Sequence, residues 1–345
     1  MRILFVGSGS GGHVYPMYSL LKEAKKRHDV TYLVLAKSFE ERLLKDEDVD
    51  KIYLSLPTQA SYYKKHPLQV KTLVTKMKEL EKKMDGFDAV ILGGGFITFI
   101  VAILAKKKKI PYYLHEQNAI LGDANLYSLK YAKALFSCFP NLNVNKKYQK
   151  KVFCYGNPRA IEALTYQKKE SHPLPFRILF VAGSLGSMTL LEMMSQVSKH
   201  IEDEFIVITG KKYYEDAKKM TWGKSTRLLM YTEQLSLYMA RASLIIMRAG
   251  ATSVMEAAYL KIPMLLIPSP YVKHHHQDEN AKYFVSIGGA KSVKEKNITE
   301  EELLVILRDL KNNPSQLYKM HESLKAFKNL DSSTLILKEI EKNDR

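Results

Sequence analysis

The chain has 345 residues, a length that indicates two domains rather than one core. Its formal net charge of +17 is concentrated in residues 1–160, which predicts an anionic partner, either nucleic acid or an acidic membrane surface. No helix-turn-helix, zinc-finger or aromatic RNA-binding signature occurs, so a nucleic-acid partner is not expected. The two cysteines, Cys138 and Cys154, have no paired spacing, which favours a reducing cytoplasm.

Two apolar runs bear on targeting and on membrane insertion. Ile3–Val6 stops at Gly7, so it is too short for the apolar core of a signal peptide. Phe96–Ala105 has the length of a buried helix and is shorter than a membrane span. We therefore expect any membrane contact to be made by the protein surface.

The first predicted elements are a strand, a glycine loop and a helix. Arg2–Val6 has the apolar pattern of a buried strand, residues 7–13 (GSGSGGH) form the loop, and a helix is predicted from about Pro16. Glycines let a backbone approach a ligand closely, and a helix N-terminus favours negative charge. The loop is therefore a candidate ligand site.

The residues of this loop and of the strand after it bear on whether the ligand is NAD. Residues 7–12 match the dinucleotide fingerprint G-x-G-x-x-G, but the next strand, Val30–Leu35, ends in Ala36 and Lys37. A dehydrogenase would need an acidic residue there to hold the adenosine ribose, so the NAD interpretation loses support. A lone histidine such as His13 is usually structural. Its place at the rim of the glycine loop favours a catalytic role instead.

Residues 66–84 have a helical period of apolar side chains, with lysines on the other side. The favoured interpretation is an ordinary helix that packs on the core and leaves its lysines in solvent. The alternative is a basic amphipathic face that lies on anionic lipid, extended by Tyr62, Tyr63, Lys64 and Lys65 just before it.

Polar residues follow the next two predicted strands. Ala89–Leu92 leads into a second glycine turn, and Tyr112–Leu114 leads into residues 115–118 (HEQN). Doubly wound sheets bind ligands at such strand ends, which makes Glu116 and Asn118 candidates for ligand binding. Both residues are equally suited to capping a loop, and the two interpretations stay open.

The second half of the chain repeats the plan of the first. Gly156–Arg159 marks the end of the first domain, and residues 161–175 have the composition of a linker. A strand, the glycine loop Gly183–Ser187 and a helix follow. Further strands are predicted at Phe205–Thr209, Arg227–Tyr231 and Leu244–Met247.

Arg248–Pro268 is the stretch best suited to holding a nucleotide. It runs from a strand end through a loop with Gly250 into a helix that we expect to open at Thr252 or Ser253. Such a helix end is a natural seat for a diphosphate. Glu256 lies one turn inside the helix, where it can accept hydrogen bonds from ribose hydroxyls.

The segment after this stretch contains three consecutive histidines, residues 274–276. Adjacent side chains rarely converge on one ion, so we expect no metal site here. Gln277 and Asn280 are three residues apart on one helix face and could both hydrogen-bond a sugar. Residues 300–345 are predicted to be amphipathic helices that close the structure. Two such domains, with a nucleotide held by one and His13 on the other, describe a glycosyl-transfer site.

Six short motifs follow one another along the chain: SGSGGHVYP (8–16), HEQNAILGDAN (115–125), YGNPR (155–159), AGSLGS (182–187), RAGATSVMEA (248–257) and HHQDENA (275–281). Together and in this order they resemble the motifs of the MurG family. These bacterial N-acetylglucosaminyltransferases make lipid II and belong to the two-domain GT-B glycosyltransferases.

The resemblance implies an α/β GT-B fold of two Rossmann-like, doubly wound domains that face each other across a cleft. Residues 1–158 would form the acceptor- and membrane-facing domain, and residues 159–175 a linker. Residues 176–320 would form the UDP-sugar domain, and residues 321–345 a helical segment that packs back on the N-terminal domain.

The resemblance also implies the reaction. An inverting glycosyltransferase would move N-acetylglucosamine from UDP-N-acetylglucosamine to the C4 hydroxyl of lipid I, the MurNAc-pentapeptide-diphosphoundecaprenol, and so make lipid II for peptidoglycan synthesis. No cofactor and no metal are implied. The partners would be these two substrates and an anionic membrane surface, at the cytoplasmic face of the bacterial inner membrane.

Matched residue by residue, His13 corresponds to the general base, Glu256 to the glutamate on the uridine ribose, and Gln277 to the glutamine that reads the sugar. The other expected substrate contacts are Ser10, Gly11, Gly12, Asn118, Arg159, Ser184, Thr232, Thr252, Ser253 and Asn280.

Three departures from the family pattern affect this match. Arg159 follows Asn-Pro one residue earlier than usual, Leu185 replaces a glutamine, and His276 stands where a first glutamine often sits. The alternatives are another UDP-sugar lipid glycosyltransferase, a UDP-GlcNAc 2-epimerase, or a non-catalytic UDP-sugar-binding subunit that docks on membranes.

Overall fold

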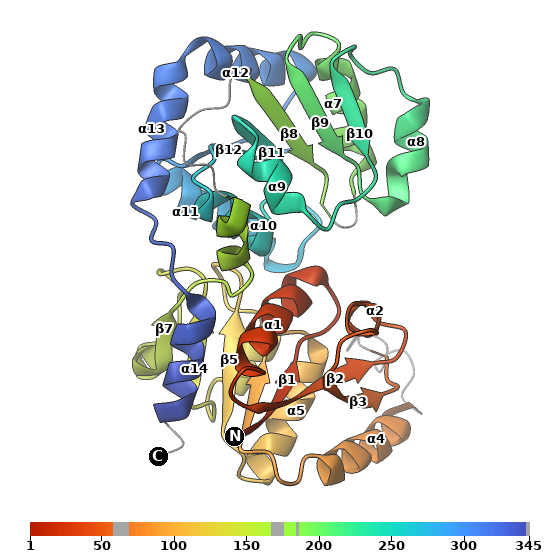
Figure 1. Cartoon of the computed structure of the whole chain (residues 1–345), viewed down its shortest axis with the longest axis vertical. Coiled ribbons are helices and arrows are strands. Elements are labelled where there is room, and N and C mark those ends of the chain that lie inside the picture. Colours follow the sequence, from red (N-terminus) through yellow and green to blue (C-terminus); the bar gives the residue numbers. More distant parts are fainter. Residues whose placement is uncertain (58–68, 167–175, 184–185, 343–345) are drawn as a thin grey trace. The chain divides into compact units, whose positions relative to one another are not determined.

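The computed structural model describes residues 1–57, 69–166, 176–183 and 186–342. The chain divides into two compact units, unit 1 (Met1–Arg159 with Leu330–Arg345) and unit 2 (Ala160–Asn329). Each unit is built on one parallel sheet with helices packed against it (Figure 1). The predicted α/β class is therefore confirmed for both halves of the chain.

The sheet of unit 1 has seven parallel strands. They are β1 (Arg2–Val6), β2 (Asp29–Leu35), β3 (Asp50–Leu54), β4 (Ala89–Leu92), β5 (Tyr112–Glu116), β6 (Ala134–Ser137) and β7 (Val152–Cys154). Their order across the sheet is β3-β2-β1-β4-β5-β6-β7, so the chain reverses its direction of winding between β1 and β4. Loops at the carboxyl ends of these two strands are where such sheets bind ligands.

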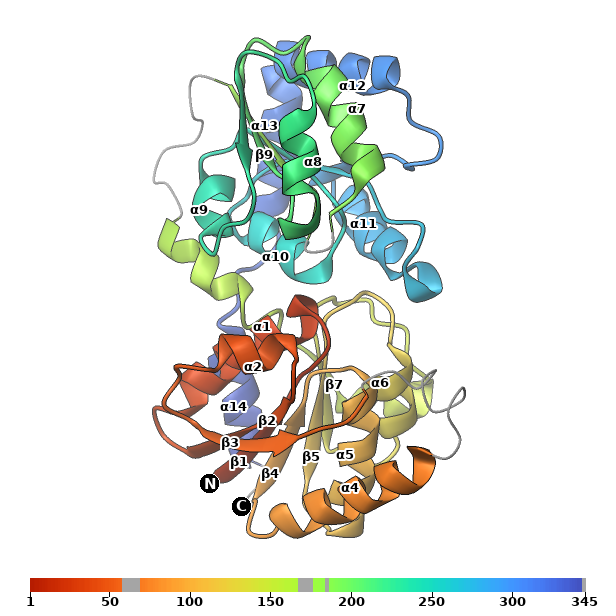
Figure 2. The same ribbon diagram turned by 90° about the vertical axis from the view of Figure 1, so that its right-hand side faces the viewer.

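Alternate strand residues divide the core of unit 1 into two layers. Leu4 and Val6 of β1 point to the face covered by α4 (Gln69–Lys83) and α5 (Phe96–Lys107). Ile3 and Phe5 point to the face covered by α1 (Gly11–Ala24) and α14 (Ser332–Lys342). Figure 2 shows these two helices beside the strands of unit 1. Three shorter helices occur among the described residues of the unit: α2 (Phe39–Leu43), α6 (Asp123–Ser128) and η1 (Lys146–Lys151).

The sheet of unit 2 has six parallel strands. They are β8 (Arg177–Val181), β9 (Glu204–Ile208), β10 (Thr226–Leu229), β11 (Leu244–Met247), β12 (Met264–Leu266) and β13 (Ala290–Ser292). Their order is β10-β9-β8-β11-β12-β13, which places the winding reversal between β8 and β11. Both units therefore carry their glycine loops at the strand ends that favour ligands.

Helices of unit 2 pack around this sheet. The core over one face is made by α7 (Met188–Ser198), α12 (Glu300–Asn312) and α13 (Pro314–Lys325). The other helices are η2 (Ala160–Tyr166), η3 (Lys211–Tyr213), α8 (Tyr214–Lys219), α9 (Leu235–Ala240), α10 (Ala251–Tyr259), η4 (Lys273–His275) and α11 (His276–Ser286). η2 occupies the start of the predicted linker and packs against α9 and α10, while residues 167–175 lie outside the described residues.

Two predicted helix starts are wrong. α1 begins at Gly11 and continues through Pro16, because the amides of His13 and Val14 already bond to the Ser10 carbonyl, and the missing Pro16 donor removes only one bond of the helix. α10 begins at Ala251, with Gly250 instead of a Ser or Thr in the capping position. As a result, His13 and Thr252 both lie inside a first helical turn.

Candidate functional site

The first glycine loop is held tightly against the core of unit 1. A Cβ atom on Gly7 would lie 2.7 Å from Met17 Cγ and 2.8 Å from the His13 carbonyl oxygen, so no other residue fits there. The buried Tyr32 hydroxyl donates a 2.8 Å hydrogen bond to the Gly7 carbonyl. The loop then turns at Gly9, whose φ of +94° favours glycine, and Ser10 follows it as the residue before α1.

His13 is the third residue of α1 and is half-buried. Its Nδ1 lies 3.2 Å from the Ser8 carbonyl oxygen. A carbonyl only accepts hydrogen bonds, so this contact places the proton of the neutral ring on Nδ1 and the lone pair on Nε2. Gly94, at the end of β4, lies against the ring: a Cβ there would be 3.0 Å from His13 Cδ2.

His115, by contrast, is a buried structural histidine. Burial lowers its pKa from 6.5 to about 4, so the ring is neutral near pH 7. Gln117 Nε2 donates to His115 Nδ1 (2.9 Å) and to the carbonyl of Gly93 (2.9 Å). His115 Nε2 lies 3.4 Å from the Gly156 carbonyl. This network ties β5 to the glycine turn that touches His13.

Glu116 organises the loop after β5. Its carboxylate is buried and accepts hydrogen bonds from the backbone amide of Asn118 (3.0 Å), the side-chain amide of Asn118 (3.2 Å), the amide of Gly122 (2.9 Å) and Asn125 Nδ2 (2.8 Å). A carboxylate with this many donors serves as the centre of the loop. Of the two interpretations left open for Glu116, the structure supports loop capping, and the capped loop presents Asn118.

Arg159 lies beside α1 at the end of unit 1. Its backbone amide donates to Asn157 Oδ1 (2.9 Å), and its guanidinium carbon is 5.2 Å from the centroid of the Tyr15 ring. Tyr15 is two residues from His13, so the arginine and the histidine are brought to the same helix end of unit 1.

The glycine loop of unit 2 follows β8. Gly183 and Gly186 have φ values of +87° and +69°, and a Cβ on Gly186 would lie 2.6 Å from the Tyr213 ring. Ser187 caps α7, since its side chain accepts from the Leu190 amide (3.5 Å). Ser184 and Leu185 lie outside the described residues, so the contact predicted for Ser184 stays a prediction.

The residue before α10 is a glycine with free space at its Cβ position among the described residues. A Cβ on Gly250 would meet none of their atoms within 4 Å. Thr252 and Ser253 are half-buried in the first turn. Glu256 is buried further along the helix and accepts a 3.3 Å hydrogen bond from Ser236 Oγ.

Three other predicted contact residues also belong to unit 2. Gln277 Oε1 accepts a hydrogen bond from the Ser269 amide (2.8 Å), which fixes the side chain at the start of α11. Asn280 is fully buried, and its amide donates to the Ala249 carbonyl (3.0 Å), so it supports the loop before α10. Thr232 Oγ1 accepts from the Gln234 amide (3.0 Å) in the loop before α9.

Sequence reasoning did not assign roles to Arg248, Glu295 and Ser187. The Arg248 guanidinium makes two 2.9 Å contacts with the Glu295 carboxylate and donates to Ser187 Oγ (2.9 Å). Arg248 comes directly after the apolar strand β11, which was a visible signal, but Glu295 lies 47 residues further along the chain. Such a pairing cannot be read from local pattern.

Neither a metal site nor a membrane span stands out in the described part of the chain. Its histidines, cysteines and carboxylates form no group of three or more that could hold a metal ion. His274 and His275 adopt positive φ values of +54° and +50° just before α11. Among residues 1–57, 69–166, 176–183 and 186–342, no helix combines the length and apolarity needed to cross a membrane.

Comparison with known proteins shows two family matches. Residues 3–137 match the glycosyltransferase family 28 N-terminal domain, and residues 177–335 match the glycosyltransferase family 28 C-terminal domain. The two matches lie in unit 1 and, apart from the last residues of the second, in unit 2.

Similar proteins cover nearly the whole chain. The UDP-N-acetylglucosamine--N-acetylmuramyl-(pentapeptide) pyrophosphoryl-undecaprenol N-acetylglucosamine transferase of Thermosipho africanus is 33% identical over 327 residues, with 90% of this chain and 92% of that protein covered. The transferase of the same name from Natranaerobius thermophilus is 29% identical over 367 residues and covers 99% of both chains. The crystal structure of MurG from Acinetobacter baumannii superimposes with a TM-score of 0.79 at 25% identity, again over 99% of both chains.

Proposed function

Because this chain belongs to glycosyltransferase family 28 and, within it, to the MurG family, we propose that its own loops carry out that family's transfer. It is an N-acetylglucosaminyltransferase that moves the sugar from UDP-N-acetylglucosamine to N-acetylmuramyl-(pentapeptide) pyrophosphoryl-undecaprenol, lipid I, and makes lipid II for peptidoglycan synthesis. The observation that carries this function is the match to transferases of this name over the full length of both units.

For the donor, we propose that unit 2 holds UDP-N-acetylglucosamine at the start of α10. The backbone amides of Thr252 and Ser253 would meet the diphosphate, in the open space before Gly250. The buried Glu256 carboxylate, which only accepts hydrogen bonds when ionised, suits the paired hydroxyls of the ribose. Gln277 would contact the sugar with its amide nitrogen, since its oxygen is bound to Ser269.

Three further donor contacts and a supporting role for Asn280 complete this proposal. Ser184 would lie near the phosphates and the Thr232 backbone near the uracil, and Asn118 would also contact the donor. Asn280 would act alongside Gln277, by holding the Ala249 carbonyl. Ser10, Gly11, Gly12 and Arg159 would lie around the anionic part of the substrates, at the first turn of α1.

For the chemical step, we propose that His13 is the general base. Its Nε2 would take the proton from the acceptor C4 hydroxyl while that oxygen forms a bond to C1 of N-acetylglucosamine. The bond from C1 to the UDP oxygen breaks, and the electron pair stays on the β-phosphate. Attack from the opposite side inverts the configuration at C1. The amides at the α10 N-terminus stabilise the charge that develops on the diphosphate.

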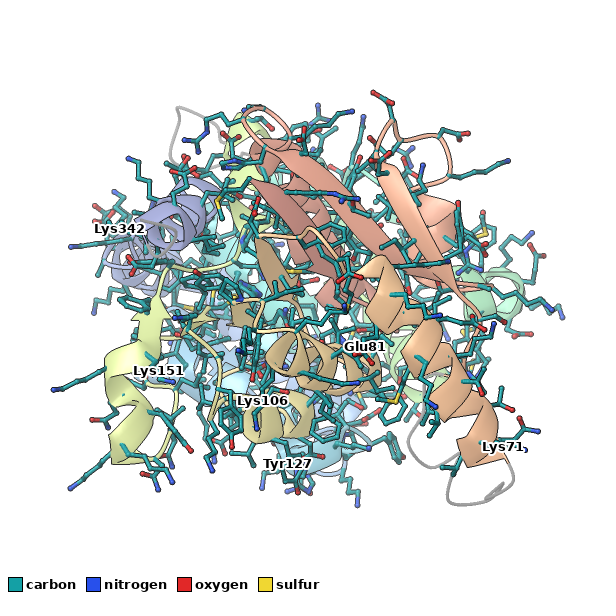
Figure 3. The ribbon with its side chains drawn as sticks, turned by 90° about the horizontal axis from the view of Figure 1, so that it is seen from below. Lys71, Glu81, Lys106, Tyr127, Lys151 and Lys342 are labelled. Atoms are coloured by element: carbon teal, nitrogen blue, oxygen red, sulfur yellow. The ribbon has the colours of Figure 1, made fainter. Side chains whose placement is uncertain are left out.

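A surface of unit 1 supports the proposal of an anionic membrane as a partner. Phe99 and Ile103 on α5 and Tyr127 on α6 leave 36%, 43% and 70% of their surface exposed, and the Phe99 and Tyr127 rings are 6.1 Å apart. Lys106 Nζ lies 3.5 Å above the ring of Tyr131, which is also exposed. We call these five residues the α5–α6 patch. Figure 3 shows Lys106 and Tyr127 on this side of the unit.

The helix before this patch has a mixed character. α4 buries Leu80 and partly buries Met77, as the favoured interpretation expected, but leaves Val70 and Val74 more than 40% exposed. Tyr62, Tyr63, Lys64 and Lys65 lie outside the described residues. Exposed apolar side chains among lysines are typical of surfaces that rest on anionic lipid. We propose that the enzyme binds the cytoplasmic face of the cell membrane in this way.

The transfer is tested by measuring UDP release and lipid-linked product. Purified protein is incubated with UDP-N-acetylglucosamine and either a lipid I analogue, diacylglycerol or no acceptor. We expect UDP release and a disaccharide product with lipid I alone. Product on diacylglycerol would indicate another lipid glycosyltransferase, free N-acetylmannosamine without acceptor would indicate an epimerase, and nucleotide binding without any product would indicate a docking subunit.

A further inference from the structure

A buried ion pair joins the ends of two strands in unit 2. Arg248 follows β11 and Glu295 follows β13, and their side chains are 11% and 7% exposed. Each of the two guanidinium nitrogens, Nη1 and Nη2, lies 2.9 Å from a different carboxylate oxygen. This two-point geometry fixes the orientation of the guanidinium as well as its position.

The same guanidinium reaches two other loops. Nη2 donates to Ser187 Oγ at 2.9 Å, and Nη1 donates to the carbonyl of Ile267 at 3.2 Å, just after β12. Ser187 is also within 3.4 Å of Glu295 Oε1 and caps α7. The arginine therefore connects the loops that follow β8, β11, β12 and β13 at the carboxyl edge of the sheet.

The connection lies next to the proposed diphosphate site. Gly183 begins the glycine loop, and a Cβ there would be 3.8 Å from Arg248 Cγ, so the arginine packs along this loop. Gly250, which opens α10, is only two residues after Arg248. The Arg248 side chain thus holds the cap of α7, its backbone lies two residues before the start of α10, and its guanidinium is held by Glu295.

A buried ion pair is a poor choice for stability alone, since well-packed apolar residues of similar size often stabilise a fold as well. It does impose one arrangement on the groups that it joins. Its charges also balance each other, so the Arg248 charge is already matched before any nucleotide arrives. A diphosphate at α10 would then be met mainly by backbone amides, whose positions must be accurate.

We propose that Glu295 is a positioning residue for the sugar-nucleotide donor, acting through Arg248 and Ser187. It holds Arg248 in the orientation that contacts Gly183 and Ser187 and places its backbone just before α10. This inference rests on the proposed function, because it requires a diphosphate at the start of α10. It assigns Glu295 no contact with the substrate.

The test is a kinetic comparison of Glu295→Gln with the wild type. We expect the KM for UDP-N-acetylglucosamine to rise at least about tenfold, while the KM for the lipid I analogue stays within about twofold. Binding of UDP, measured by calorimetry, should weaken by a similar factor. Glu204→Gln is the matched control. It breaks the 2.5 Å ion pair with Arg177 at the amino ends of β8 and β9, away from the carboxyl ends that carry the proposed site, and should change neither KM.

A second pair of variants keeps the buried ion pair intact. Ser187→Ala removes the hydroxyl that Arg248 holds and should also raise the donor KM, whereas Ser187→Thr keeps a hydroxyl and should restore it. If Glu295→Gln does not fold, these two Ser187 variants test whether the Arg248 connection positions the donor site. A role in stability alone would lower the melting temperature without separating alanine from threonine in donor KM, and that result would overturn the proposal.

Two other outcomes are informative. Tighter UDP binding by Glu295→Gln would mean that Glu295 competes with the nucleotide for Arg248, which contradicts a positioning role. An unchanged donor KM in Glu295→Gln and in Ser187→Ala would also overturn it. If the wild type transfers sugar to lipid I in the same assay, these results reject only the role of Glu295; if it neither binds UDP-N-acetylglucosamine nor transfers, the proposed function itself fails.

Discussion

Two histidines of unit 1 differ in burial, and this difference separates a candidate catalytic residue from a structural one. His13 is half-buried on the first turn of α1, with Nδ1 directed at the Ser8 carbonyl. His115 is fully buried and bonded to Gln117, and its pKa of about 4 keeps it uncharged. A base that must gain and lose a proton needs access to its substrate, so His13 fits that role and His115 fits a structural one.

The proposed base is tested by His13→Ala. We expect turnover to fall at least about a hundredfold, since general-base catalysis contributes factors of this size. The KM for UDP-N-acetylglucosamine should change little, because the donor is proposed to bind unit 2. Initial rates with the lipid I analogue measure both quantities. Turnover close to that of the wild type would remove His13 as the base.

The buried His115 predicts a dependence of stability on acid. An unfolded chain protonates this residue below about pH 6.5, whereas the folded chain resists protonation until about pH 4. His115 therefore does not lower the free energy of unfolding above pH 6.5. As the pH falls toward 4, the free energy of unfolding decreases by about 3 kcal/mol in total. Urea unfolding at pH 7.5 and 4.5 measures the loss.

His115→Gln should flatten that part of the stability profile, although it also lowers stability at pH 7.5 by disrupting the network to Gln117 and Gly156. His200→Gln, at an exposed position after α7, is the control and should leave the profile as it is. If the profile of His115→Gln keeps its full slope between pH 6.5 and 4, another group causes the acid sensitivity.

At the scale of elements, the helix start at α10 is the critical feature. Gly250 has φ −68° and ψ 128°, a conformation that any residue can adopt, and a Cβ there meets no described atom within 4 Å. Nothing in the described fold therefore requires glycine. A glycine at this position is explained if the diphosphate of the donor lies against it.

Gly250→Ala tests this explanation. The melting temperature should stay equal or rise slightly, since Gly→Ala at a compatible position reduces the entropy of the unfolded chain. The donor KM should increase at least about tenfold, because the added methyl group enters the proposed diphosphate space. Thermal unfolding and initial rates measure the two effects. A variant with normal donor KM would place the diphosphate elsewhere.

At the scale of the whole molecule, charge and exposed apolar surface coincide in unit 1. The net charge of +17 and the α5–α6 patch both favour an anionic, apolar partner such as a membrane surface. Attraction of this kind weakens as salt screens the charges. The apolar part of the attraction does not depend on salt in this way.

We expect the protein to sediment with vesicles that contain anionic lipid at low salt and to be released at high salt. Lys106→Glu with Lys130→Glu, both beside Tyr131, should reduce binding at least about fivefold and leave transfer to a water-soluble lipid I analogue unchanged. Lys218→Glu with Lys219→Glu on α8 of unit 2 is the matched charge control. Binding that is indifferent to lipid charge and to salt would contradict the proposed membrane partner.

Local pattern determined much of this protein. The apolar strands β1, β4 and β11 and the glycine loops after β1 and β8 were predictable, because buried parallel strands are continuous apolar runs and glycines mark the turns that follow them. The short strands β3, β6, β7 and β13 were not predicted. Charged residues interrupt β3 (DKIYL) and β13 (AKS), and β7 has only three residues, so these strands lack the continuous apolar run that marks β1, β4 and β11.

Only the tertiary structure decided which polar groups act together. The sequence by itself determined that Glu116 and Arg248 stand at the carboxyl ends of buried strands, and it narrowed the ligand to a sugar nucleotide. It did not determine that the Glu116 carboxylate turns inward to hold its own loop, or that Arg248 pairs with Glu295. Such partners are set by how strands and loops far apart in the chain pack against each other. Contacts between residues so far apart leave no local pattern in a single sequence.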